Sequence, residues 1–158
     1  MSRVQLALNV DDLEQAVAFY SKLFGAEPAK TRPGYANFAL AEPPLKLVLI
    51  ENPGHGGGLN HLGVEVASTG EVDATQRRLA EVGLASVDER GATCCYATQD
   101  KFWVKGAPNG ERWEIYTVLA DSPTFRGEPG DGPSCCSDQP HDVVESGAKA
   151  AATTASCC

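Results

Sequence analysis

The feature of this sequence that most constrains its fold is an internal repeat. Residues 4–10 align with residues 60–66, and in this alignment Gln5 corresponds to His61. Both segments alternate apolar with polar or small residues, which is the pattern of a half-buried strand. Gln5 and His61 therefore point away from the face that carries Leu6 and its counterpart in the second copy. A functional site is expected on the face that Gln5 and His61 share.

A helix and two strands are predicted to follow the first copy of the repeat. Asp11 and Glu14 have the spacing of a capping box, and the apolar residues after them recur at helical intervals. Gly25 then provides a C-terminal stop. The other elements predicted for this half are a loop at residues 28–34 and strands at residues 35–40 and 45–51.

The second copy is followed by the same order of elements. Ser68 and Glu71 again have capping-box spacing. Val72, Leu79 and Val82 lie on one face of the predicted helix. The elements predicted after it are strands at residues 84–89, 101–104 and 112–118, a loop at residues 90–100 and a hairpin turn at residues 108–110.

These patterns predict how the chain is organised. Each half reads as a strand, a helix and then two or three strands, which is typical of one pseudo-symmetric α+β domain. Residues 121–158 differ, because small and polar residues dominate and no period is present. Such a segment cannot bury enough surface to offset its ordering entropy. We predict a domain over residues 1–120, with modules at about 2–52 and 58–119, and a mostly disordered tail over residues 121–158.

Length and charge argue against several classes of function. The chain has 158 residues, enough for one well-buried core. Its formal net charge of −8 argues against a nucleic-acid partner. No apolar run is long enough to cross a bilayer, so no membrane partner is expected. Residues 1–3 lead directly into the first strand without a signal peptide, so we expect a cytoplasmic protein with reduced thiols.

All of the cysteines stand in adjacent pairs. A disulfide framework would spread its cysteines along the chain, and neighbouring cysteines do not bridge each other easily. Zinc sites usually separate their thiolates by about two to four residues. Adjacent thiolates suit a larger, softer centre such as trivalent arsenic, cadmium or mercury. Chance pairing of inert cysteines would explain one pair better than three. The pairs are Cys94-Cys95, Cys135-Cys136 and Cys157-Cys158.

Together these motifs resemble the vicinal oxygen chelate superfamily, which includes glyoxalase I, extradiol dioxygenases and the bleomycin and fosfomycin resistance proteins. This resemblance implies two βαβββ modules that form one cupped mixed sheet. Over residues 2–118 the chain is most similar to the organoarsenical carbon–arsenic lyases (ArsI) and the related cadmium-induced proteins (CadI). The most specific element is Thr-Cys-Cys-Tyr-Ala at residues 93–97. The other segments that carry the resemblance are residues 4–8, 19–25, 33–38, 43–49, 61–66 and 112–116.

The resemblance implies an Fe(II)-dependent dioxygenase that cleaves the carbon–arsenic bond of trivalent organoarsenicals, such as methylarsenite and trivalent aromatic arsenicals, and releases arsenite. Transferred by position, the metal ligands and catalytic residues are Gln5, His61 and Glu114, and dioxygen is the co-substrate. Three protein ligands leave open positions for oxygen and substrate. Glyoxalase I has a fourth ligand on the last strand of its first half, which here would require Glu51 to reach back.

The cysteines complete the implied site. Cys94 and Cys95 are expected to bind the arsenic of the substrate. The remaining pairs, Cys135, Cys136, Cys157 and Cys158, are possible accessory thiols. Both halves lie on one chain, so a site within one subunit is expected, in a monomer or a homodimer.

Other interpretations of these residues stay open. Gln5 alone is compatible with an ordinary hydrogen-bonding strand residue, and His61 with a satisfied core histidine. Glu114 lies between two large apolar residues, and burying a carboxylate costs several kcal/mol unless a cation pairs with it. The alternative functions are a thiol protein that sequesters cadmium or arsenic without turnover, and a drug-binding or glutathione-dependent resistance protein of the same fold.

Overall fold

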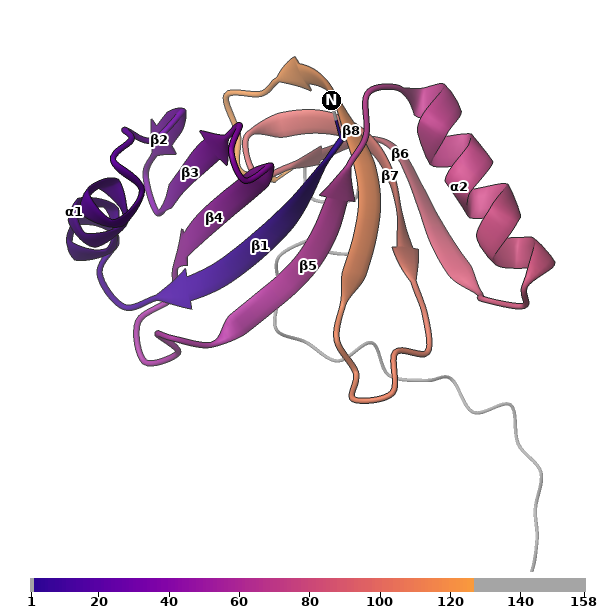
Figure 1. Ribbon diagram of the computed structural model, residues 1–158, viewed down its shortest axis with the longest axis horizontal. Helices are drawn as coiled ribbons and strands as arrows, with labels where there is room; N and C mark the ends of the chain where they lie inside the picture. The colour runs from indigo at the N-terminus through magenta and orange to yellow at the C-terminus, as the bar shows by residue number, and fades with distance from the viewer. Residues whose placement is uncertain (1, 127–158) are drawn as a thin grey trace, which may run out of the picture.

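A curved mixed sheet forms the centre of the fold. The computed structural model describes residues 2–126, which form eight strands and two helices (Figure 1). The strand order across the sheet is β2-β3-β4-β1-β5-β8-β7-β6. In chain order the elements are β1 (Arg3–Val10), α1 (Leu13–Phe24), β2 (Lys30–Arg32), β3 (Tyr35–Leu40), β4 (Leu45–Glu51), β5 (Leu59–Glu65), α2 (Thr69–Glu81), β6 (Ser86–Cys94), β7 (Ala97–Val104) and β8 (Trp113–Asp121).

The two copies of the repeat, β1 and β5, lie side by side at the middle of the sheet. They are antiparallel, and their register pairs Gln5 with Gly63 and Ala7 with His61. Each is flanked on its other side by a parallel strand, β4 beside β1 and β8 beside β5. The two halves are therefore related by an approximate two-fold axis between β1 and β5. The predicted α+β fold, with two βαβββ modules in one cupped mixed sheet, is confirmed.

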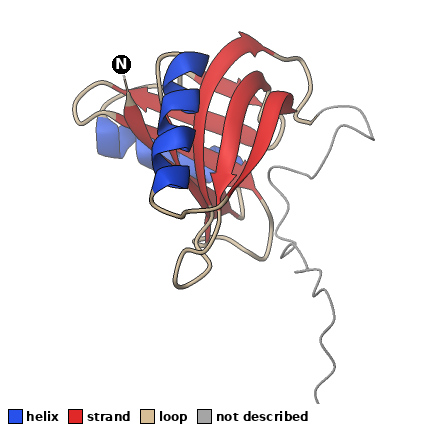
Figure 2. Ribbon diagram, turned by 90° about the vertical axis from the view of Figure 1, so that its right-hand side faces the viewer, coloured by secondary structure: helices blue, strands red, loops and turns tan. Residues whose placement is uncertain are grey.

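Both helices cover the same face of the sheet, which leaves the concave face for the site. The apolar side of α1 packs on β3 and β4, and α2 packs on β7 and β8 (Figure 2). Leu6 and Leu8 join the core under α1, and Val64 joins the core under α2. The alternation of each strand therefore turns Gln5 and His61 to the opposite face, as the repeat predicted.

Two details of the first half differ from the predictions. The N-cap of α1 is Asp12, whose side chain accepts a hydrogen bond from the Gln15 backbone N–H at 2.9 Å. Asp11 instead accepts hydrogen bonds from the backbone of Gly54 and Gly56, so the capping box is shifted by one residue. The predicted loop at residues 28–34 contains the short strand β2, which forms a hairpin with β3.

The predicted cysteine loop at residues 90–100 is wrong, because β6 and β7 continue through it and meet in a tight turn. Cys94 pairs with Ala97, and the two residues between them have positive φ angles of 53° and 60°. Two residues with positive φ form a type I′ turn, which matches the twist of the strands. The predicted hairpin between β7 and β8 is confirmed. Val82 was predicted on the apolar face of α2 but lies beyond its end and is 68% exposed.

The start of the predicted tail is part of the folded domain. β8 continues to Asp121, and the backbone oxygen of Phe125 accepts a hydrogen bond from the Cys95 N–H at 2.8 Å. The Phe125 ring packs against Tyr35 and Tyr96. The cysteines at 135, 136, 157 and 158 lie outside the described residues. Neither helix of residues 2–126 has the length and apolar character that crossing a membrane requires.

Candidate metal and thiol site

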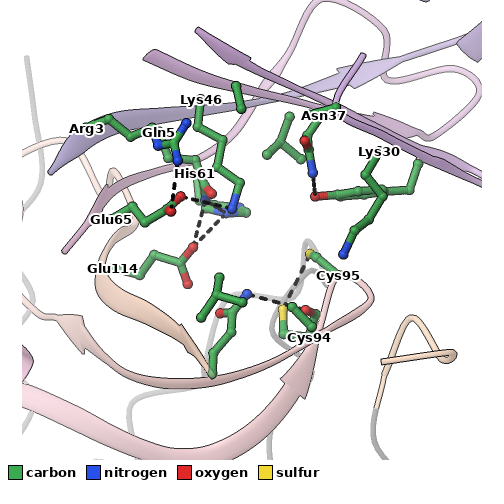
Figure 3. Close-up of a pocket in the computed structure, with 17 residues that line it drawn as sticks. Arg3, Gln5, Lys30, Asn37, Lys46, His61, Glu65, Cys94, Cys95 and Glu114 are labelled. Carbon is green, nitrogen blue, oxygen red and sulfur yellow. Dashed lines mark hydrogen bonds and ion pairs between the residues drawn. The ribbon is translucent and has the colours of Figure 1, made fainter. Parts of the chain in front are cut away.

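A cavity of about 220 Å³ on the concave face brings the predicted site residues together (Figure 3). Gln5, His61 and Glu114 lie in one part of its lining, and Cys94 and Cys95 lie in another. All of these side chains come from the two central strands and from the β6–β8 side of the sheet. The cavity is smaller than the ~300–1,000 Å³ typical of drug-sized ligands. It is therefore suited to a small ligand.

The sheet register explains why the polar side chains converge. Gln5, Gly63 and Glu114 are paired directly across β1, β5 and β8. Gly63 leaves the space between the other two open, since a Cβ there would lie 3.1 Å from Glu114 Cγ and 3.3 Å from Gln5 Nε2. His61 enters the same space because it lies two residues before Gly63 on the same face.

The donor atoms of these three side chains lie close together and are almost fully buried. Gln5 Nε2 is 2.7 Å from Glu114 Oε1 and 3.0 Å from His61 Nε2. His61 Nε2 is 3.3 Å from Glu114 Oε1. Each of the three residues is at most 4% exposed. The structure thus brings together the residues that the sequence predicted as a ligand set.

Asn60 orients the imidazole of His61. His61 Nδ1 is 2.7 Å from Asn60 Oδ1, and the Asn60 amide nitrogen donates to Asn9 Oδ1 at 3.0 Å. Asn60 Oδ1 is therefore an acceptor, so the proton of a neutral imidazole lies on Nδ1. The lone pair of Nε2 then faces Gln5 and Glu114. This is the arrangement that a carbonyl partner gives to metal-binding histidines.

A buried lysine keeps Glu114 ionised. Burial acts to raise the pKa of the Glu114 carboxyl, but the charge of Lys101 and its hydrogen bond to Glu114 act against burial, so this pKa lies well below its usual range. Lys101 Nζ is 3.1 Å from Glu114 Oε2 and 3.5 Å from Glu89 Oε2. Lys101 is fully buried, and its ammonium group also lies over the Trp103 ring. Glu114 thus presents a charged oxygen, Oε1, to Gln5 and His61.

A second acidic residue, Glu65, is connected to Gln5 through the hydroxyl of Tyr116. Tyr116 Oη is 2.6 Å from Gln5 Oε1 and 3.0 Å from Glu65 Oε2. Burial acts to raise the pKa of Glu65, but Lys46 and Arg3 reverse this effect and lower it overall. Burial, reinforced by the charge of Glu65, raises the pKa of the Tyr116 phenol well above its usual value. Tyr116 is therefore a neutral hydroxyl and Glu65 a carboxylate.

The two cysteines form the other part of the cavity lining. Their Sγ atoms are 3.5 Å apart, at the turn between β6 and β7. Cys94 is 3% exposed and Cys95 is partly buried. Cys94 is disulfide-bonded in this structure, which differs from the expectation of reduced thiols. Lys30 points toward Cys95 (Figure 3), and its ammonium group donates to the Tyr96 backbone oxygen at 3.2 Å.

Gln99 lies beside the cysteine turn and also lines the cavity. Its Nε2 donates to the Cys94 backbone oxygen at 3.4 Å. Within residues 2–126, its Oε1 is one of two buried side-chain oxygen or nitrogen atoms without a hydrogen-bond partner. Gln99 therefore offers a free acceptor to a ligand in the cavity.

The donor set fits a divalent metal ion, although only His61 and Glu114 are of residue types that commonly bind metals. No group of three His, Cys, Asp or Glu residues with metal-site geometry occurs in residues 2–126, so a metal ion bound by His61 and Glu114 would need the Gln5 amide as its third donor. The cavity-facing residue of β4 paired with Gln5 is the cation Lys46. Glu51, the suggested fourth ligand, accepts a hydrogen bond from the Leu13 N–H instead. An imidazole, a carboxylate and an amide oxygen suit Fe(II) or a similar divalent ion.

Several residues of this site were not predicted. Apart from Gly63, their shared signal is a polar side chain inside a strand, as with Lys101, which is followed by three apolar residues. The alternation of the strands would have assigned Glu65, Gln99 and Tyr116, with Gly63 and Lys101, to the same face as Gln5 and His61. Asn60 directly precedes His61, so alternation alone would have assigned it to the other face. These residues are Asn60, Gly63, Glu65, Gln99, Lys101 and Tyr116.

The chain was compared with known proteins. The Glyoxalase/Bleomycin resistance protein/Dioxygenase superfamily matches residues 3–115. A cadmium-induced protein CadI of Mycobacterium tuberculosis is 65% identical, covering 88% of this chain and 95% of the relative. A trivalent organoarsenical cleaving enzyme of Thermomonospora curvata is 57% identical over the full length of both proteins.

A solved structure, a homoprotocatechuate 2,3-dioxygenase from Brevibacterium fuscum, aligns with a TM-score of 0.55 at 19% identity. The alignment covers 77% of this chain and 33% of the dioxygenase. At this identity the likeness supports the fold alone. From the sheet topology and the match over residues 3–115, the chain belongs to the Glyoxalase/Bleomycin resistance protein/Dioxygenase superfamily, the vicinal oxygen chelate fold.

Proposed function

We propose that this protein cleaves the carbon–arsenic bond of small trivalent organoarsenicals and releases arsenite. The observation that carries the proposal is one buried cavity lined by a Gln–His–Glu donor set and by two adjacent cysteines. A soft-ligand site and a candidate metal site in the same small cavity fit a substrate that contains both arsenic and a carbon group. The full-length relative named as an organoarsenical cleaving enzyme supports the same reaction.

The cysteines would capture the substrate. In their reduced state Cys94 and Cys95 each replace one hydroxyl of methylarsenite, which forms two arsenic–sulfur bonds and releases two molecules of water. The Sγ separation of 3.5 Å lets one arsenic atom contact both sulfurs without opening the turn. Two bonds fix the arsenic in place, and such positioning can contribute several kcal/mol to the rate. Pentavalent arsenicals lack this affinity for thiols and are not expected to react.

The Gln5, His61 and Glu114 side chains would hold Fe(II) through Oε1, Nε2 and Oε1, respectively. Fe(II) supplies the redox chemistry that lets dioxygen react with the substrate. Asn60 keeps the proton of His61 on Nδ1, and Lys101 keeps Glu114 charged.

The reaction balances without an external reductant. Methylarsenite and dioxygen together contain the atoms of one formaldehyde and one arsenite. The carbon–arsenic bond breaks, the carbon is oxidised, and both oxygen atoms of dioxygen are reduced into the products. Gln99 Oε1 would accept a hydrogen bond from a hydroxyl of the arsenite product.

The test is a reconstitution with Fe(II) under anaerobic conditions, followed by methylarsenite and air, with arsenic species separated by chromatography. Arsenite is expected only when both Fe(II) and oxygen are present. Cys94→Ala should greatly lower turnover at ordinary substrate concentration. Full activity of this variant would contradict the capture role of the cysteines.

A second function is favoured by the relative named cadmium-induced protein. In this alternative the thiols sequester cadmium or arsenic and no turnover occurs. Sequestration predicts tight binding that survives Glu114→Ala, with methylarsenite recovered unchanged. The lyase predicts that Glu114→Ala still binds methylarsenite but no longer releases arsenite.

A further inference from the structure

We infer that Tyr116 and Glu65 set the orientation of the Gln5 side-chain amide, so that its oxygen rather than its nitrogen faces His61 and Glu114. Tyr116 is thus a positioning residue for the metal site and not a ligand. This inference rests on the metal site of the proposed function and assigns the residues that make a glutamine able to serve as a ligand there.

The hydroxyl of Tyr116 has one proton but two acceptor neighbours. Its oxygen is 2.6 Å from Gln5 Oε1 and 3.0 Å from Glu65 Oε2. A phenol donates one hydrogen bond, and an ionised carboxylate donates none. With the amide oxygen toward Tyr116, one of these two short contacts therefore lacks a proton.

Turning the Gln5 amide by 180° removes this conflict, and the two orientations occupy nearly the same space. The amide nitrogen then donates to the Tyr116 oxygen, and the Tyr116 proton goes to Glu65. Each of the two short contacts now has its own hydrogen. The hydrogen-bond chain runs from Gln5 through Tyr116 to Glu65.

Glu65 is held as the acceptor at the end of this chain. Lys46 Nζ is 3.2 Å from its Oε2, and Arg3 lies 3.3 Å from its Oε1. Two cations on one half-buried carboxylate keep it charged, and a charged acceptor forms the stronger hydrogen bond. The Tyr116 proton therefore points to Glu65 and not to Gln5.

With the amide turned, the contacts that lack a hydrogen lie between Gln5, His61 and Glu114. Gln5 Oε1 would take the place of the nitrogen that lies 3.0 Å from His61 Nε2 and 2.7 Å from Glu114 Oε1. His61 Nε2 carries a lone pair because Asn60 holds the proton on the other nitrogen. Three lone pairs then face one another, and a cation between them satisfies all three. Tyr116 and Glu65 thereby favour the form of the site that binds a metal ion.

The experiment compares Co(II) binding in four proteins: the wild type, Tyr116→Phe, Glu65→Leu and the double variant. Tyr116→Phe removes the acceptor for the amide nitrogen, and Co(II) affinity should fall by about tenfold, within the ~10–100-fold range of such supporting residues. In Glu65→Leu the Tyr116 hydroxyl has no carboxylate to bind and donates to Gln5 Oε1 instead. The amide nitrogen of Gln5 is then held toward His61 and Glu114, and the Co(II) affinity should fall further than in Tyr116→Phe. Adding Tyr116→Phe to Glu65→Leu should then raise the affinity.

This change of sign separates orientation from charge and packing. Glu65→Leu and the double variant carry the same charge, so an electrostatic effect of Glu65 cancels between them. An equal effect of Tyr116→Phe in both backgrounds would overturn the inference and leave the metal site intact. If the wild type did not bind Co(II), both this inference and the proposed metal site would be overturned.

Two further proteins keep the test interpretable. Lys46→Met can be added to all four proteins if Glu65→Leu alone does not fold, since it removes one of the two cations that lose their carboxylate partner. Tyr35→Phe is the matched control, because Tyr35 is another buried tyrosine of the cavity whose hydroxyl is bound by Asn37 at 2.8 Å. Its Co(II) affinity should equal that of the wild type, and a loss as large as that of Tyr116→Phe would contradict the inference.

Discussion

The two halves of the sheet place different chemistry on equivalent positions. Around the axis between β1 and β5, Ala7 pairs with Val48 in the first half as Gly63 pairs with Glu114 in the second. The first half thus has a valine where the second half has the buried carboxylate. The space beside Glu114 is kept open by a glycine, whereas the corresponding position beside Val48 is an alanine.

This difference shows how a duplicated fold separates two roles within one cavity. The second half, together with Gln5, forms the polar part that suits a metal ion. Around Val48, the first half contributes an apolar cluster that also includes Ala7, Tyr35 and, from the second half, Tyr96. An organic group on arsenic would contact this apolar wall, since the cysteines lie next to it. The predictions below test this division.

The largest effect is expected when the second half is made like the first. Glu114→Val removes a proposed ligand and takes away the nearer of the two carboxylates beside the buried Lys101. Co(II) binding should be lost, and the free energy of unfolding in urea should fall by about 3–5 kcal/mol. Glu114→Val combined with Lys101→Met should recover much of the stability but none of the Co(II) binding. Co(II) binding retained by either variant would contradict the ligand role of Glu114.

The converse change makes the first half like the second. Val48→Glu, combined with Ala7→Gly to open the space beside it, adds a carboxylate to the cavity as a fourth possible metal ligand. Co(II) affinity should rise, and arsenite release should fall by about tenfold, which corresponds to ~1.4 kcal/mol, because the apolar wall is lost. Unchanged turnover would show that this wall does not contact the substrate.

A smaller effect is expected from the glycine of the metal half. Gly63→Ala places a Cβ 3.1 Å from Glu114 Cγ, so the side chains must separate. Such crowding typically costs about 1–3 kcal/mol, and Co(II) affinity should fall. The matched variant in the other half, Ala7→Gly, should reduce the stability by about 0.5–1 kcal/mol without changing Co(II) affinity. If Gly63→Ala bound Co(II) as tightly as the wild type, the need for an open space at Gly63 would be contradicted.

The smallest effects concern the helix caps, which differ between the halves. Ser68→Ala should lower the stability by about 1 kcal/mol at any pH, because the cap of α2 is a neutral hydroxyl. The hydrogen bonds from Gln15 lower the pKa of Asp12 from 3.8, so its cap on α1 stabilises the fold above that value. This contribution is lost as the pH falls through the folded-state pKa.

Urea unfolding at pH 7 and in acid measures this difference. Asp12→Ala should be less stable than the wild type at pH 7, and the gap should shrink in acid. The effect of Ser68→Ala should not change with pH. A gap for Asp12→Ala that is the same at both pH values would contradict the capping role of the charged carboxylate.

The sequence was informative where a simple period was present. The repeat placed Gln5 and His61 on one face, because alternation in a strand leaves little freedom once one face is buried. Their convergence with Glu114 is now observed, whereas their role as metal ligands stays a prediction. The turn at Cys94-Cys95 was missed because a register shift after Glu89 interrupts the alternation of β6. The turn also uses two residues other than glycine at positive φ, which no simple turn signal reveals.

The supporting residues could not be predicted because they depend on pairing between distant strands. Tyr116 and Glu65 are 51 positions apart in the sequence, and Tyr116 is 111 positions from Gln5. Only the register of β5 with β8 brings them together. Cys135, Cys136, Cys157 and Cys158 lie outside the described residues, and their accessory role stays a prediction.

The most direct test of the central claim is the stoichiometry of a single experiment. The Fe(II)-loaded protein is mixed with methylarsenite in oxygen-limited buffer, and oxygen uptake, arsenite and formaldehyde are measured in the same sample. The proposed reaction predicts one oxygen molecule consumed for each arsenite and each formaldehyde formed. Arsenite released without oxygen uptake, or methylarsenite recovered unchanged on the protein, would contradict it.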